Sequence, residues 1–180
     1  MSRIALIGKM GSGKTTIAEI MCKYHGYKKM SFGDKVKNVC TDLFNMDYKN
    51  RELITSVAEK MKEISPDVWV NYVINKINIE DPNYKGNWVI DDCRFPNEYD
   101  KLKEIGFNFI YVYVDENTQL KHLKNKYTDY LDHISLKNHI SEKYIEELGK
   151  KKDVIFIDNN NIKLDDINNF ILNILIVHYI

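Results

Sequence analysis

The sequence predicts an α/β domain in which a five-stranded parallel sheet carries helices on both faces. Short apolar runs alternate with helical stretches along the chain, and this alternation is typical of βαβ units. The 180 residues, 44% of them hydrophobic, have the size of one domain with a sizeable core. No linker, repeat or Pro/Gly-rich hinge divides the runs, so we expect a single domain over residues 1–180 in three layers.

Each expected strand is an apolar run bounded by polar residues. The five runs are Ile4–Ile7, Lys29–Phe32, Trp88–Ile90, Phe109–Val114 and Val154–Ile157. Apolar residues at helical spacing predict a helix over Thr15–Lys23 and another from Asp34 to about Leu43. Two further helices, about Glu52–Glu63 and Asp67–Ile77, fall between the second and third strands. This fold class often inserts a substrate-binding region there, and we place it at about residues 45–80.

The last part of the chain is expected to hold a lid and a closing helix. The polar stretch Gln119–Asn138 has little apolar periodicity, which favours a mobile lid at about residues 117–140. The run Phe170–Ile180 is shorter than the ~20 residues that a membrane-spanning helix needs, so we interpret it as a core-packing helix. The aromatic residues Phe109, Tyr111 and Tyr113 alternate along one strand, and we expect them in the core.

Charge and cysteine usage exclude several classes of protein. Lys and Arg number 26 and Asp and Glu 26, so the formal net charge of +0 argues against a nucleic-acid partner. No segment is expected to act as a signal peptide or to enter a membrane. Cys22, Cys40 and Cys93 are scattered and odd in number, which favours a reducing compartment, and we expect a cytoplasmic protein.

A phosphate-binding loop follows the first strand. The G-x-x-x-x-G-K-[ST] pattern is met in full by Gly8, Lys9, Met10, Gly11, Ser12, Gly13, Lys14 and Thr15. Glycines let such a loop turn its backbone N–H groups around a triphosphate, and the following helix presents its positive end. Lys14 is then expected to bridge the β- and γ-phosphates of ATP, and the Thr15 hydroxyl to ligate Mg²⁺.

Charged residues follow two other strands where ligands bind in doubly wound sheets. Asp92 can hold magnesium through water and Arg94 can clamp the phosphate of a second substrate, although a surface Asp–Arg pair is the alternative. Asp34 follows the second strand. It is either a carboxylate that orients or deprotonates an acceptor, or the N-cap of the next helix.

With these residues in view, the chain resembles the bacteriophage-type deoxynucleoside monophosphate kinases of the P-loop kinase superfamily. The resemblance rests on the phosphate loop and four further segments, of which the Asp-x-Arg-Phe-x-Asn-Glu block is the most specific. They are residues 31–37 (SFGDKVK), 67–70 (DVWV), 92–98 (DCRFPNE) and 139–142 (HISE).

The resemblance implies transfer of the γ-phosphate of ATP to a deoxynucleoside monophosphate with Mg²⁺ present, and it allows a homodimer. Catalysis is expected from Lys14, Asp34, Asp92 and Arg94, and metal binding from Thr15 and Asp92. Donor binding is expected from the loop residues Gly8 to Thr15 with Thr16, Lys124 and Asn160. Acceptor binding is expected from Asp34, Lys37, Arg51, Trp69, Arg94, Phe95 and Glu98.

Two departures from the family pattern stand out. Thr15 stands where members often carry Asp, and the lid offers Lys121, Lys124 and Lys126 where arginines are expected. For His139 and Glu142, a structural pair on a helix is our first interpretation and a role in the site the second.

Other functions on this scaffold remain open at this stage. The alternative within the same fold is another small-molecule kinase, similar to phosphomevalonate or dephospho-coenzyme A kinases. A guanine-nucleotide switch is disfavoured because Asn125-Lys126-Tyr127-Thr128 lacks the Asp of the base-reading motif. A polynucleotide kinase is disfavoured because no basic stripe with interleaved aromatic residues is present.

Overall fold

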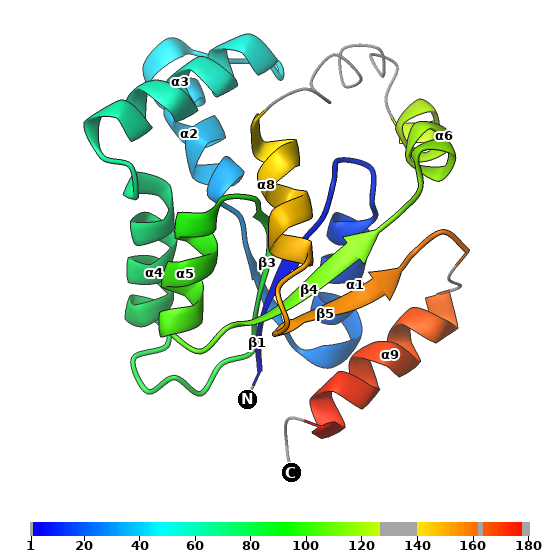
Figure 1. The fold of residues 1–180 in the computed structure, drawn as a ribbon. Helices are drawn as coiled ribbons and strands as arrows, with labels where there is room; N and C mark the ends of the chain where they lie inside the picture. The colour runs from blue at the N-terminus through cyan, green and yellow to red at the C-terminus, as the bar shows by residue number, and fades with distance from the viewer. Residues whose placement is uncertain (1, 127–139, 162–163, 178–180) are drawn as a thin grey trace. The chain divides into compact units, whose positions relative to one another are not determined.

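The computed structural model describes residues 2–126, 140–161 and 164–177 (Figure 1). The sheet has the strand order β2-β3-β1-β4-β5. The strands are β1 (Arg3–Ile7), β2 (Lys28–Met30), β3 (Trp88–Cys93), β4 (Asn108–Tyr113) and β5 (Val154–Asp158). β1 pairs in parallel with β3 and β4, and β4 pairs in parallel with β5. The five predicted strands and their parallel sheet are confirmed.

The chain divides into two compact units, residues 30–85 and the remainder. The larger unit holds the sheet, apart from Met30 at the end of β2, and five helices. These helices are α1 (Lys14–His25), α5 (Pro96–Glu104), α6 (Glu116–Lys126), α8 (Ile140–Gly149) and α9 (Leu164–Val177). α1 and α9 share one apolar cluster with the strands. α8 contacts β1, β5 and α5. The sheet is therefore sandwiched between two helical layers, as the sequence predicts.

Alternate side chains of β4 pack against the helices on opposite faces of the sheet. Ile110 and Val112 belong to the cluster shared with α1 and α9. Phe109 points to the opposite face, where its ring lies 4.1 Å from that of Tyr99 on α5. Tyr113 is 37% exposed, so its expected core position is wrong. It ends the strand and stacks on Phe156 of the edge strand β5, which is itself exposed.

The smaller unit is a group of three helices, α2 (Phe32–Phe44), α3 (Arg51–Ile64) and α4 (Val68–Glu80), in which α2 contacts both others. The helices expected between the second and third strands are thereby confirmed. Phe32 was expected in the second strand but opens α2, because Ser31 is extended and serves as the N-cap. The indole Nε1 of Trp69 donates to the Ala58 carbonyl at 3.1 Å and ties α4 to α3.

The closing helix starts earlier than the apolar run predicts. α9 begins at Leu164, six residues before Phe170, and buries Ile167 and Ile171. No helix in the described part of the chain has the length and apolar character needed to cross a membrane.

Candidate nucleotide site

The phosphate loop runs from the end of β1 to the first residue of α1, so the strand-loop-helix context of the motif is confirmed. Lys14, the first residue of α1, folds its side chain back over the loop. Its Nζ donates to the carbonyls of Gly8 at 2.6 Å and Lys9 at 2.8 Å. The loop also closes on itself, because the Ser12 N–H donates to the Lys9 carbonyl at 3.1 Å. The lysine is thus held at the place where a phosphate would enter.

The Lys14 amine lies among charges of both signs. Its burial lowers its pKa to about 7, and the nearby Arg94 guanidinium acts in the same direction. The carboxylates of Glu142, Asp91 and Asp92 oppose that shift. The arrangement brings Lys14, Asp92 and Arg94, all predicted for catalysis, into one electrostatic neighbourhood.

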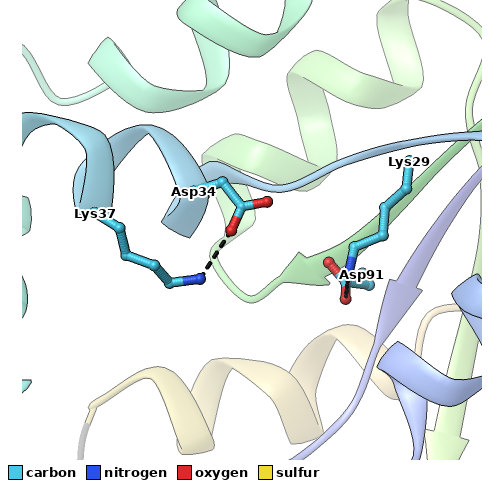
Figure 2. Close-up of polar contacts among 4 residues, drawn as sticks. All are labelled: Lys29, Asp34, Lys37 and Asp91. Atoms are coloured by element: carbon cyan, nitrogen blue, oxygen red, sulfur yellow. Dashed lines mark hydrogen bonds and ion pairs between the residues drawn. The ribbon is translucent and has the colours of Figure 1, made fainter. Parts of the chain in front are cut away.

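The two carboxylates at the end of β3 differ in burial and in the face of the strand that they occupy. Asp91 is buried and forms an ion pair with Lys29 at 2.9 Å, which links β3 to the strand beside it (Figure 2). Asp92 follows on the opposite face of the strand and is half-buried. Both carboxylates act on the pKa of Lys14, and metal binding by Asp92 stays a prediction.

Glu98 supports the turn that carries Arg94. It lies in the first turn of α5, and its Oε2 accepts the backbone N–H groups of Arg94 at 2.7 Å and Phe95 at 3.0 Å. Burial raises the pKa of this carboxyl to about 7. The Phe95 ring lies 6.0 Å from that of Tyr144 on α8. Glu98 therefore binds the backbone of the turn. Its contact with an acceptor stays a prediction.

α8 brings two carboxylates to the phosphate loop. Glu142 is 9% exposed, and burial raises its pKa while the Arg94, Lys14 and Lys9 cations act to lower it. Glu146, one helical turn later, pairs with Lys9 at 2.5 Å. Sequence reasoning gave Glu142 a structural pairing first, but the fold places it beside the loop cations. His139 lies outside the described residues.

The loop after β5 contacts the phosphate loop from the side. The Asn159 Nδ2 donates to the Ser12 carbonyl at 2.8 Å. Asn160 accepts the Asp115 N–H at 2.8 Å and donates to Asp158 at 2.7 Å, so it joins the ends of β4 and β5. Its expected contact with the donor base stays a prediction.

α6 occupies the first part of the predicted lid. This part of the stretch is a helix, and its Gln119 and Leu123 are buried. Lys124 and Lys126 are exposed on this helix, and residues 127–139 lie outside the described part of the chain. Contact of a lid lysine with the transferred phosphate stays a prediction.

The acceptor residues expected from the smaller unit have local partners of their own. Asp34 is the third residue of α2 and not its N-cap, so the capping alternative is wrong. Its carboxylate pairs with Lys37 at 2.8 Å, and both side chains are exposed (Figure 2). Arg51 is the first residue of α3. Acceptor binding by these three residues and by Trp69 stays a prediction.

The residues expected to hold magnesium suit that ion. Thr15 is the second residue of α1 and supplies a hydroxyl, and Asp92 supplies a carboxylate close enough to Lys14 to affect its pKa. Mg²⁺ prefers such hard oxygen ligands and usually completes its shell with waters and substrate phosphates. Among the described residues there is no group of three or more His, Cys, Asp or Glu side chains arranged for a metal. Thr16, the next residue of α1, is exposed.

The parallel sheet, the loop between β1 and α1 and the buried lysine on that loop define the class of protein: a P-loop kinase domain. The particular family follows from the sequence. The chain belongs to the AAA domain family, whose profile matches residues 4–147.

One curated relative matches over part of the chain. It is a candidate deoxynucleotide monophosphate kinase of Acanthamoeba polyphaga mimivirus, 28% identical over 136 residues, which are 59% of this chain and 70% of the relative. The resemblance noted from the sequence is confirmed at the level of the P-loop kinase domain.

Solved structures establish the same fold. A sugar kinase from Janibacter superposes with a TM-score of 0.63 at 14% identity, covering 96% of this chain and 93% of its own. A shikimate kinase from Acinetobacter baumannii gives 0.60 at 16%, covering 99% and 94%. A gluconokinase from Sinorhizobium meliloti gives 0.57 at 13%, covering 97% and 96%. At these identities the likeness concerns the fold alone.

Proposed function

We propose that the protein transfers the γ-phosphate of ATP to a deoxynucleoside 5′-monophosphate, giving the diphosphate and ADP. The observation that carries the proposal is the position of Arg94, close enough to Lys14 for its charge to lower the pKa of that amine. Lys14 belongs to the donor loop, so a second cation beside it suits an acceptor that is itself a phosphate. The mimivirus relative, described as a kinase of this class, supports the choice.

The proposed reaction requires mainly that the protein hold the phosphates of ATP and of the acceptor in line. The bond from the γ-phosphorus to the β–γ bridging oxygen breaks, and an oxygen of the acceptor phosphate forms the new bond. Lys14 balances the charge that moves onto the leaving ADP, and Arg94 offsets the repulsion between the two phosphates. Magnesium, held by Thr15 and Asp92 with the phosphates, would supply further positive charge.

Asp34 orients the acceptor in this proposal and removes no proton from it. A phosphate monoester carries a charge of about −1.5 to −2 at pH 7, so its attacking oxygen is already ionised. The Asp34 carboxylate pairs with Lys37, one turn later on α2, at 2.8 Å. We therefore expect Asp34 to act through acceptor binding.

The test is magnesium-dependent ADP release from ATP with each deoxynucleoside monophosphate and each ribonucleotide offered as acceptor. A no-acceptor reaction is the control. Stimulation by at least one deoxynucleotide is expected. Asp34→Asn is expected to raise the acceptor KM and Arg94→Ala to lower turnover, with ATP affinity kept in both. Equal ADP release without any acceptor would contradict the proposal.

Sugar, gluconate and shikimate acceptors belong in the same panel, because the solved structures of the same fold carry those names. Transfer to one of them and to no nucleotide would replace the proposed acceptor. The scattered cysteines support a cytoplasmic site of action, and a homodimer stays a prediction that light scattering can test.

A further inference from the structure

The phosphate loop is held from outside by side chains that do not belong to its motif. Three consecutive carbonyls of the loop each accept a side-chain hydrogen bond. Gln119 Nε2 donates to the Met10 carbonyl at 2.7 Å, and His122 Nδ1 contacts the Gly11 carbonyl at 2.8 Å. Asn159 Nδ2 donates to the Ser12 carbonyl at 2.8 Å. Two of these donors come from α6 and the third from the loop after β5.

Holding these carbonyls fixes the direction of the neighbouring N–H groups. A trans peptide is planar, and its C=O points opposite to the N–H of the next residue. The bonds to Met10 and Ser12 therefore turn the N–H groups of Gly11 and Gly13 away from α6 and Asn159. The bond to Gly11 orients the Ser12 N–H, which donates to the Lys9 carbonyl at 3.1 Å within the loop. Phosphate binding by such a loop depends on N–H groups that converge on the anion.

The glycines of the motif make this approach possible. A Cβ on Gly11 would lie 3.1 Å from Leu123 Cγ and 3.3 Å from the Gln119 carbonyl oxygen. Gln119 is 4% exposed and Leu123 1%, so neither can retreat into solvent. Burial also means that water cannot easily replace the Gln119 donor.

The hydrogen position on His122 follows from its partner. A carbonyl oxygen only accepts hydrogen bonds, so the ring nitrogen that faces Gly11 must carry the hydrogen. His122 is therefore expected in the Nδ1–H form whenever it is neutral.

We propose that Gln119, His122 and Asn159 are positioning residues that preset the phosphate loop for the donor nucleotide. We assign none of these three side chains a direct contact with a phosphate. They raise the fraction of molecules whose loop N–H groups already face the phosphate site. The apparent Kd for the nucleotide rises as that fraction falls. The inference rests on the proposed function only through its donor site and is independent of the acceptor.

The experiment measures binding of ADP and of a non-hydrolysable ATP analogue with Mg²⁺ by titration calorimetry, with no acceptor present. Gln119→Met and His122→Leu remove one donor each at similar volume. Each is expected to raise Kd about three- to tenfold, the range for one hydrogen bond. His122→Asn is expected to restore affinity, because the Asn Nδ2 can occupy the place of Nδ1. Asn125→Ala, at an exposed position of the same helix, is the matched control and is expected to bind like the wild type.

Two readouts separate positioning from a simple role in stability. In the full reaction the KM for ATP should rise in Gln119→Met and His122→Leu while the acceptor KM stays constant. In the wild type, nitrogen NMR of the His122 ring should show a protonated Nδ1, a measurement that needs no variant.

Wild-type affinity in folded Gln119→Met and His122→Leu would overturn the inference, as would an unprotonated Nδ1. An equal loss of affinity in Asn125→Ala would overturn it too, because the effect would then belong to the helix as a whole. Failure of the proposed function looks different: nucleotide binding and its dependence on these residues would remain, and no deoxynucleotide would accept phosphate.

Discussion

Gly13→Ala perturbs the phosphate loop at the point where it meets Asn159. Gly13 has φ +96° and is the N-cap of α1. A Cβ there would lie far inside van der Waals distance of the Asn159 Nδ2 atom. The substitution therefore strains the backbone and displaces the Asn159 side chain from the Ser12 carbonyl.

The expected magnitude is the sum of these two effects. A non-glycine residue in the left-handed region costs about 1–2 kcal/mol, and a lost hydrogen bond costs about 1 kcal/mol. Together they reach about 2–3 kcal/mol, or roughly 30- to 150-fold in an equilibrium constant. If the loop relaxes to relieve the strain, ADP affinity falls by this factor. If the loop holds its shape, the free energy of unfolding falls instead.

Calorimetric titration with ADP and urea unfolding together measure the two parts. Gly26→Ala is the matched control, because Gly26 has φ +68° and no atom within 4 Å of its added Cβ. It should lower stability by about 1 kcal/mol through backbone strain and leave ADP affinity unchanged. In an Asn159→Ala background, Gly13→Ala should have a smaller effect, by about 1 kcal/mol, because the clash is gone. The same effect in both backgrounds would refute the reasoning.

Three further predictions concern groups away from the loop. Burial raises the pKa of Glu98 to about 7, so the folded state holds that proton longer and stability falls as pH rises from about 4.5 to 7. The fall in the free energy of unfolding amounts to up to about 3 kcal/mol across that range, and Glu98→Gln should remove it in urea unfolding experiments. An unchanged pH profile of stability in the variant would contradict this prediction. Asp153, whose pKa is lowered to about 2 chiefly by Lys103, is largely exposed, and Asp153→Asn should lower stability by only about 0.5–1 kcal/mol at pH 7. Because the shift is downward, that difference should vanish as pH falls through 2; a deficit persisting there would point to packing. Gly149→Ala would put its Cβ 2.8 Å from the Tyr111 ring and should lower the thermal midpoint through about 1–3 kcal/mol of overpacking; an unchanged midpoint would show that α8 shifts freely.

The strands and most helices could be predicted because their signal is local. Apolar runs between helical stretches gave every strand of the sheet to within a few residues. The errors fall at element ends. Phe32 is apolar enough for a strand, but the extended Ser31 starts a helix there. Tyr113 alternates correctly with Tyr111, yet it ends its strand and remains exposed.

The residues of the candidate site likewise divide into those with a local sequence signal and those without one. The phosphate loop is a contiguous motif, so its residues and the position of Lys14 followed from spacing alone. Gln119 and His122 left no such signal, since a glutamine and a histidine three apart on a polar helix suit any solvated face. Glu142 gave only an ambiguous pairing signal. Their proximity to the loop depends on how α6 and α8 pack.

By itself the sequence determined the fold class, the phosphate loop and the charged block at the end of β3, because each is encoded by neighbouring residues and by hydrophobic period. Tertiary structure alone decided that Asp91 pairs with Lys29, and that Gln119 and His122 hydrogen-bond to carbonyls of the phosphate loop. Those contacts join residues up to 111 positions apart. Their formation depends on burial and on the directions of strands and helices, which no local pattern specifies.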